Sequence, residues 1–181
     1  MLRIGDIWFL LIIVFISLLL KTGSVSAGQK EFGNQNNIYI TEWARLRHQA
    51  ELGDPDALFV LGNYYFKPPR GSSFRKNLNK SAEYYFQSAI RKNAAAQYNF
   101  AFMLHKGLGV QQNTLESYVW FKIASLNPSP VAKHVNQLSR DVVATLELDM
   151  DKAQIELANQ KLKEYQENID KKRFRQLKYP D

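Results

Sequence analysis

The side chains that could carry out chemistry are few and widely separated in this sequence. His48, His105 and His134 each stand alone on a predicted helix, and none has a second histidine four residues away. That spacing is the one with which a helix presents two ligands to a metal ion. The absence of cysteine excludes a thiol nucleophile, a disulfide scaffold, a zinc finger and an iron–sulfur centre. We therefore expect no metal and no other cofactor.

The glycine-rich sequence Gly107-Leu108-Gly109-Val110 is the nearest approach to a phosphate-binding motif. A phosphate loop follows a strand and continues into Gly-Lys-Ser/Thr, and neither feature is present here. We interpret the segment as a tight helix–helix turn that uses the access of glycine to positive φ. Ser81 and Ser117 lack the strand–turn–helix elbow of a nucleophilic serine, and no pair of acids has a catalytic spacing. The sequence thus predicts a protein that is not an enzyme.

Aromatic side chains at helical spacing are better candidates for a binding role. Two separate segments carry large or polar side chains at positions i, i+4 and i+7, which places them on one face of a helix. Such a face can form a groove that binds a protein or peptide through aromatic anchors. The alternative is that part of the stripe packs on a neighbouring helix. The predicted binding stripe consists of Phe59, Asn63, Phe66, Tyr98, Phe102 and His105.

The helices that must position this stripe occur in a repeat. Residues 57–66 align with residues 96–105 at an offset of thirty-nine. Each segment is followed by a second helix, and residues 82–89 align with residues 117–124 at an offset of thirty-five. The difference falls in the loop inside the first repeat, which is the longer one. A period of this length that contains two helices predicts an α-solenoid.

Small and large side chains alternate between fixed positions of this repeat. Small residues let antiparallel helices approach closely, and large partners fill the adjacent holes. The predicted structural positions are Ala57, Leu61, Gly62, Tyr65, Ala82, Tyr85, Ala89, Ala96, Phe100, Ala101, Leu104, Gly107, Gly109, Trp120 and Ala124.

The second repeat resembles the Sel1-like repeats, which are relatives of the tetratricopeptide repeats. Residues 50–57 are similar to the link between successive repeats of that family, whereas Pro68 and Pro69 lie in an insertion that replaces the Gly-x-Gly-Val turn of the first repeat. The resemblance covers about residues 41–170. It implies an all-α fold, a short solenoid of antiparallel helix pairs whose first helices line a concave face. The residues that carry the resemblance are Gly107, Gly109, Val110, Asn113, Ser117, Trp120 and Ala124.

The helical pattern runs from residue 41 to about residue 170, with Thr41 as the expected first N-cap. Asp151 and Gln154 have the spacing of a capping box before the last helix. The predicted helices are residues 41–52, 56–66, 79–92, 94–105 and 114–126, a degenerate unit over 131–145, and a last helix that ends near residue 169.

The last predicted helix has an apolar stripe with coiled-coil spacing, centred on Leu162. Fewer than three heptads make an independent coiled coil marginal. We therefore expect this helix to cap the solenoid by covering Val135, Leu138 and Val142, and the chain to remain a monomer. The alternative is self-association through the same stripe, which consists of Ile155, Ala158, Leu162, Tyr165 and Ile169.

The N-terminus has the order of a secretory signal peptide. Residues 7–20 are uncharged and apolar or nearly so, and small residues follow up to a predicted cut between Ala27 and Gly28. As a helix the apolar run spans about 21 Å, short of the ~30 Å hydrocarbon core of a bilayer. We expect residues 1–27 to be removed and residues 28–40 to form a flexible connector. The alternative is an uncleaved anchor with the chain facing outward. Both place the rest of the protein outside the cytoplasm, in a bacterial periplasm or secreted.

The C-terminal segment 171–181 is basic. The whole chain has 24 Lys and Arg against 17 Asp and Glu, a net charge of +7, which is too diffuse to predict a nucleic-acid partner. The segment could dock on an anionic membrane or cell-wall surface. The alternative is a solvated, fraying helix end. Its cations are Lys171, Lys172, Arg173, Arg175 and Lys178.

Three functions are compatible with these features. The leading hypothesis is a non-enzymatic, exported scaffold that binds an unidentified protein or peptide on its concave face. The second is a cell-wall- or β-lactam-related hydrolase, which the resemblance to Sel1-like proteins suggests but no pair of acids at a catalytic spacing supports. The third is a membrane-surface tether that uses the basic tail.

We predict that the exported protein begins at Gly28. The intact mass of the protein recovered from the cell envelope or medium measures this directly. A chain that retains Met1 to Ala27 in the membrane fraction would instead establish an uncleaved anchor.

Overall fold

The computed structural model describes residues 35–177 and Tyr179. The predicted signal peptide, residues 28–34 and Lys178 lie outside the described residues. The chain divides into two units, Met1–Ile38 and Tyr39–Asp181, and the packing below concerns the larger one. Among the helices of residues 35–177, none is sufficiently long and apolar to span a bilayer.

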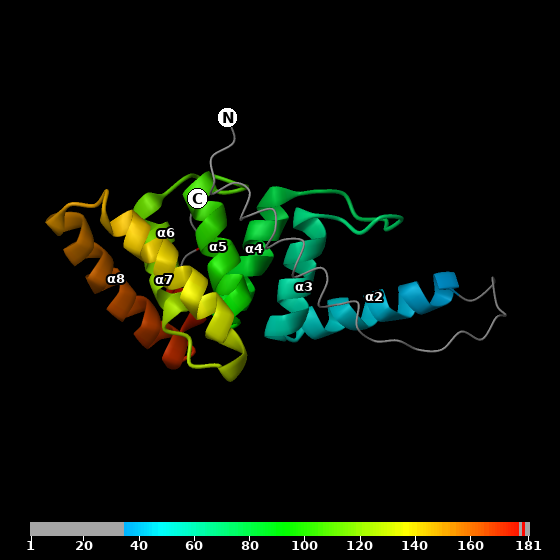
Figure 1. The fold of residues 1–181 in the computed structure, drawn as a ribbon. Coiled ribbons are helices and arrows are strands. Elements are labelled where there is room, and N and C mark those ends of the chain that lie inside the picture. Colours follow the sequence, from blue (N-terminus) through cyan, green and yellow to red (C-terminus); the bar gives the residue numbers. More distant parts are fainter. Residues whose placement is uncertain (1–34, 178, 180–181) are drawn as a thin grey trace, which may run out of the picture. The chain divides into compact units, whose positions relative to one another are not determined.

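The described part of the chain is helical and contains no β-strand (Figure 1). Successive helices are joined by short loops, and α3 packs on α4 as α5 packs on α6. This arrangement is the all-α solenoid of antiparallel helix pairs that the sequence predicts. The elements are α2 (Gln35–Glu51), α3 (Pro55–Phe66), α4 (Leu78–Ala89), α5 (Ala94–Lys106), α6 (Thr114–Ser125), η1 (Pro130–Ala132), α7 (Lys133–Glu147), α8 (Lys152–Asp170) and η2 (Phe174–Gln176).

Polar N-caps fix where the repeat helices begin. Asp54 and Asn93 cap α3 and α5, and each side chain accepts a hydrogen bond from the backbone N–H three residues ahead, at 2.7 and 2.8 Å. Asn77 and Asn113 cap α4 and α6 in the same way, both at 3.0 Å. These bonds satisfy backbone donors that have no partner inside the helix. Before α8, Asp151 forms the capping box with Gln154 that its spacing predicts.

The caps also correct the predicted alignment of the second helices. Asn77 and Asn113 are thirty-six residues apart, and their N–H groups donate to the equivalent carbonyls of Tyr65 and Leu104, at 2.9 and 3.0 Å. The predicted offset of thirty-five was therefore wrong by one residue. Tyr85 corresponds to Phe121 rather than to Trp120, because similar side chains at neighbouring positions disguised the true register.

The first helix is longer than its sequence pattern indicates. It begins at Gln35, so Thr41 lies inside α2 and the prediction that it is the N-cap was wrong. Residues 35–40, expected as connector, are the first turns of this helix. Further along α2, the ring of Trp43 stacks on Phe74 with 3.9 Å between centroids. Phe74 belongs to the insertion of the first repeat, and this contact anchors that loop to α2.

Close helix approach explains the small residues of the repeat. An ideal Cβ on Gly62 would lie 2.5 Å from Cδ1 of Tyr85, so no side chain fits between α3 and α4 at this point. The hydroxyl of Ser81 donates to the carbonyl of Gly62 at 2.8 Å. In the loop between α5 and α6, Gly109 has a φ of 71°, and a Cβ there would lie 2.2 Å from the backbone carbon of Leu78.

Most predicted structural positions are buried in the helix contacts. The exceptions are Tyr65 and Gly109, which are half-buried, and Gly107, which is exposed at the C-cap of α5. One large cluster joins α4, α5 and α6 to the C-terminal elements, while a smaller cluster around Leu58 and Leu61 lies beneath α2.

The last helix caps the array, but the helix that it covers is α6. Both α7 and α8 pack on α6. Ala158 of α8 is fully buried, and the Tyr165 ring lies 5.8 Å from that of Trp120 on α6, whereas Leu162 is only half-buried. The expected contact surface, Val135, Leu138 and Val142 of α7, was wrong, because α8 packs chiefly on α6 and makes no comparably extensive contact with α7. The buried face of α7 instead consists of Ser139, Val143 and Leu146.

We predict that Ala101→Leu lowers the free energy of unfolding by about 1–3 kcal/mol or more, because Ala101 is fully buried and extra methyl groups overpack the core. Gly62→Leu should cost at least as much because it displaces Tyr85. Urea denaturation measures both. Ala153→Leu, at an exposed position of α8, is the matched control and should change stability little. Equal midpoints for Ala101→Leu and Ala153→Leu would contradict the assignment of the helix faces.

Candidate functional site

The predicted stripe lies on α3 and α5 in a shared register. Because the caps of these helices are thirty-nine residues apart, Phe59, Asn63 and Phe66 on α3 occupy the positions of Tyr98, Phe102 and His105 on α5. All six residues are half-buried, so they lie at the edge of the core. The sequence therefore identified three half-buried positions that are equivalent in the two successive repeats.

Three residues of the stripe, Phe59, Asn63 and Tyr98, lie in contacts between helices. The Phe59 ring lies 5.9 Å from the Tyr85 ring, and Asn63 Oδ1 accepts a hydrogen bond of 2.7 Å from the Tyr85 hydroxyl. The equivalent contact of the second repeat joins the rings of Tyr98 and Phe121 at 5.2 Å. These three stripe residues hold α3 on α4 and α5 on α6, which is the alternative role that the sequence left open.

Phe66, Phe102 and His105 form the other half of the stripe, at the C-terminal ends of α3 and α5. Both phenylalanines pack on the edge of the large core cluster. Nδ1 of His105 is buried without a hydrogen-bond partner among the described residues. Burial, together with the charge of Lys106, lowers the pKa of the His105 imidazole below its ordinary value. The lowered pKa favours the neutral form of the ring at physiological pH.

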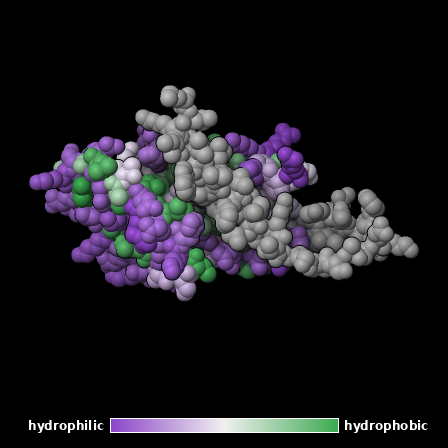
Figure 2. Space-filling model, viewed as in Figure 1, coloured by the Kyte–Doolittle hydropathy of each residue, from purple (hydrophilic) through white to green (hydrophobic). Residues whose placement is uncertain are grey.

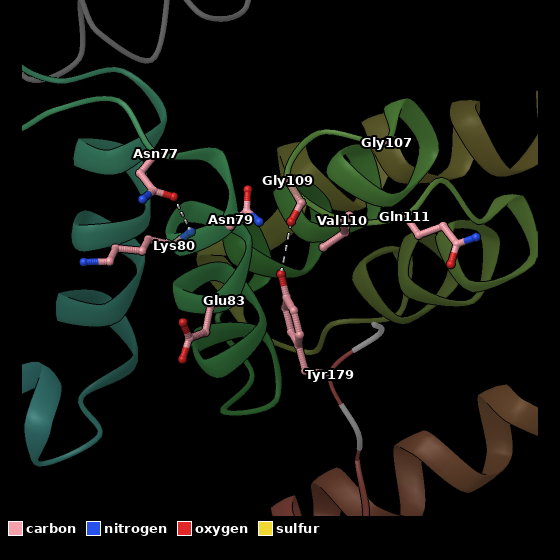
Figure 3. Close-up of a pocket in the computed structure, with 9 residues that line it drawn as sticks. All are labelled: Asn77, Asn79, Lys80, Glu83, Gly107, Gly109, Val110, Gln111 and Tyr179. Atoms are coloured by element: carbon pink, nitrogen blue, oxygen red, sulfur yellow. Dashed lines mark hydrogen bonds between the residues drawn. The ribbon is translucent and has the colours of Figure 1, made fainter.

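A second candidate is an open cavity of about 950 Å³ beside the start of α4 and the α5–α6 loop (Figure 3). Sequence reasoning did not identify it as a site. Its rim carries one amino group and one carboxylate, from Lys80 and Glu83, together with amides and backbone groups. The Asn77 amide oxygen is already occupied by the helix cap. The lining residues are Asn77, Asn79, Lys80, Glu83, Gly107, Gly109, Val110, Gln111 and Tyr179.

The cavity is lined by amide, amino, carboxylate, hydroxyl and backbone groups. Across the described residues, no three His, Asp or Glu side chains converge as metal ligands. The cavity itself contains no serine, histidine or pair of acids that could act as nucleophile and base. The lining offers both hydrogen-bond donors and hydrogen-bond acceptors.

The C-terminal segment reaches this cavity, so it is not a fraying helix end. Helix α8 ends at Asp170, and the chain then turns back to bury Leu177 in the large core cluster. The hydroxyl of Tyr179 points to the carbonyl oxygen of Gly109, 3.5 Å away (Figure 3). The signal that could have revealed this is the apolar series Phe174, Leu177 and Tyr179, which the surrounding cations obscured.

The cations of the C-terminal segment differ in their contacts and exposure. Lys171 forms an ion pair with Glu167 one turn earlier on α8. Lys172, Arg173 and Arg175 are exposed. Lys178 lies outside the described residues. Contact of these cations with an anionic surface stays a prediction.

Two clusters with the same chemistry join α6 to its C-terminal neighbours. On one side, Glu147 of α7 accepts from the Tyr118 hydroxyl at 2.7 Å and pairs with Lys122 at 3.1 Å. On the other, Glu116 of α6 pairs with Lys161 at 2.5 Å and accepts from the Tyr165 hydroxyl at 3.0 Å. Each carboxylate is thus held by a tyrosine and a lysine one turn apart on the facing helix.

The comparisons with known proteins support the fold. No protein-family model matches this sequence, and no curated protein matches it. Among solved structures, the chain is similar to a protective antigen present in uropathogenic Escherichia coli strains that displays a Sel1-like repeat fold. The match has a TM-score of 0.62 at 21% sequence identity and covers 91% of this chain and 32% of that chain. The chain thus spans about a third of the length of that protein, and the likeness shows that its solenoid is Sel1-like.

We predict that the cluster of Glu147 makes stability depend on pH in the acid range. The hydrogen bond from Tyr118 and the pairing with Lys122 hold the pKa of Glu147 below its ordinary value of 4.5. Because the folded pKa is the lower one, the contribution is present above pH 4.5 and is lost as the pH falls through the folded value.

The measurement is the urea midpoint of the wild type and of Glu147→Gln between pH 3 and pH 7. The wild type should be the more stable at neutral pH, and the difference should shrink below the ordinary pKa of glutamate. Glu156→Gln, on the exposed side of α8, is the control. A Glu147→Gln difference that stays constant over this range would contradict the assigned role of the carboxylate.

Proposed function

We propose that this protein is a non-enzymatic scaffold that acts outside the cytoplasm and binds an extended protein or peptide segment across α3 and α5. A helical-repeat fold supports this proposal, because stacked repeats create extended surfaces of the kind that such proteins use for binding. The observation that carries it is the recurrence of half-buried residues, four of them Phe or Tyr, at equivalent positions of successive first helices.

The contacts of Phe59, Asn63 and Tyr98 with neighbouring helices help the remaining stripe residues, Phe66, Phe102 and His105, to bind. Tyr85 holds Phe59 and Asn63 in place, and Phe121 holds Tyr98. The helices that carry Phe66 and His105 are therefore fixed before any partner arrives, which lowers the entropic cost of binding. Phe66 and Phe102 would supply apolar anchors, and the neutral imidazole of His105 would supply a hydrogen-bonding group.

Export is supported by the signal-like N-terminal sequence, which lies outside the described residues. The hydrolase alternative rests on family resemblance alone. Attachment to an anionic surface is favoured by one structural observation, since Lys172, Arg173 and Arg175 are exposed while the apolar side chains between and after them turn inward. Such attachment is compatible with a scaffold, because the cations and the α3–α5 stripe lie on different elements.

A random peptide display library tests the proposed surface without knowledge of the natural partner. Peptides selected on the wild-type chain should bind Phe66→Ser at least about tenfold more weakly by fluorescence anisotropy, because an anchor is lost. Leu157→Ser is the control, since Leu157 is 47% exposed on α8 and should not affect binding.

Thermal unfolding of both variants confirms that each is folded at the temperature of the assay. If peptides bind the two variants and the wild type equally, or if selection yields no binder, the α3–α5 surface is not the binding site.

A further inference from the structure

The segment after α8 leaves the helix through an unusual backbone turn. Lys172 has a φ of 52°, in the left-handed region that non-glycine residues rarely adopt. The turn is held by hydrogen bonds to the last residues of α8, including one of 2.7 Å from Arg173 N–H to the carbonyl of Asn168. This local reversal directs the following residues back along the solenoid.

Three apolar side chains then attach the segment to the solenoid. The guanidinium of Arg91 lies 5.1 Å from the ring centre of Phe174. Leu177 is only 5% exposed. The ring of Tyr179 lies 5.6 Å from that of Phe86 on α4 and 6.2 Å from that of Phe100 on α5. We call the receiving surface, formed by Glu83, Phe86, Arg91, Phe100 and Gly109, the tail groove.

Among the described residues of segment 174–179, the contacts with the tail groove are made by side chains. Within the described residues, the backbone hydrogen bond of residues 174–179 is an internal one, from Leu177 N–H to the carbonyl of Phe174 at 3.2 Å. The polar contact with the groove is the long bond of 3.5 Å from the Tyr179 hydroxyl to Gly109. Among the described residues, no backbone–backbone hydrogen bond joins the segment to the groove, so their separation from it costs mainly the burial of three side chains.

The groove continues beyond the last anchor. The open cavity of about 950 Å³ begins at Tyr179 and is lined beyond it by Asn77, Asn79, Lys80 and Glu83 (Figure 3). An extended ligand could therefore follow the apolar groove and also make polar contacts in the cavity.

The tail groove is distinct from the α3–α5 stripe. Phe100, which contacts Tyr179, and Phe102, which belongs to the stripe, are two residues apart on α5. At 3.6 residues per turn, their side chains leave the helix about 200° apart. The groove also uses α4, the second helix of its repeat, and includes no residue of α3. This inference consequently stands independently of the proposed function.

We propose that the tail groove is a second docking surface, for an extended partner segment that carries aromatic, leucine and aromatic side chains at the spacing of Phe174, Leu177 and Tyr179. The chain's own C-terminal segment is its resident and displaceable occupant. That segment shows which side chains the groove accepts, and the contacts of its described residues with the groove are made by side chains, which permits exchange. A partner binds only in the fraction of molecules whose groove is open, so the tail lowers its apparent affinity.

A fluorescein-labelled peptide with the sequence of residues 171–181 is the probe. The full-length double variant Leu177→Ser, Tyr179→Ser lacks two of its own anchors and should bind the peptide at least about tenfold more tightly than the wild type, because a tethered competitor has a high effective concentration. The matched control is Arg173→Ser, Arg175→Ser, which alters two exposed residues, retains every anchor and should bind no more tightly than the wild type.

Two further variants locate the binding. Phe86→Leu, added to the double variant Leu177→Ser, Tyr179→Ser (the anchor variant), should remove the gain in affinity because it deletes a ring that faces Tyr179. A peptide with serine in place of the phenylalanine, leucine and tyrosine should not bind the anchor variant. Equal affinity of the wild type and the anchor variant for the native peptide, with unchanged helical circular dichroism, would overturn the proposal.

A measurement on the wild-type tail keeps the test decisive even if the anchor variant fails to fold. The chain has no cysteine, so Asn79→Cys provides a single site for a nitroxide at the cavity beside Tyr179. The label should broaden the NMR signals of Tyr179, and excess unlabelled peptide should restore them as the tail leaves. Signals that remain broadened at saturating peptide would show that the tail is fixed, which sinks the proposal.

Discussion

The burial of α6 is the constraint on which the rest of this structure depends. From Glu116 to Ser125, every residue of this helix is buried except Lys122, which is half-buried. A helix that is enclosed in this way needs neighbours on every side. In the described chain, α5 supplies one side as its repeat partner, and α7 and α8 supply others. The third unit therefore ends the array by enclosing α6 rather than by forming another regular pair.

The polar residues of α6 make this enclosure specific. Glu116 is only 8% exposed, and a buried carboxylate is costly without charged or hydrogen-bonding partners. Lys161 and Tyr165 of α8 satisfy it, as Tyr118 and Lys122 of α6 satisfy Glu147 of α7. Each cluster sets the position of one helix along α6. The C-terminal segment can then return over Phe86 and Phe100, because α8 ends where its reversal begins.

The sequence predicted those features that depend on local chemistry. The period, the helix pairs, the capping box at Asp151 and the small residue at Gly62 all follow from spacing and side-chain size. The predicted register of the second helices was wrong by one residue. Trp120 and Phe121 are both large aromatic residues, so the sequence alone did not show which of them is equivalent to Tyr85. The choice of α6 over α7 as the surface beneath α8 depends on Glu116, whose partner lies forty-five residues away. The return of the tail depends on contacts equally distant in sequence.

Native-state hydrogen exchange at increasing urea tests the central role of α6 most directly. If α6 is enclosed by α5, α7 and α8, the most protected amides of α6 and α8 should exchange only through one common opening, with the free energy and urea dependence of global unfolding. The amides of α2, which lies outside the large cluster, should exchange at lower free energy. Exchange of all α8 amides through a separate opening of much lower free energy, while α6 stays fully protected, would contradict the account.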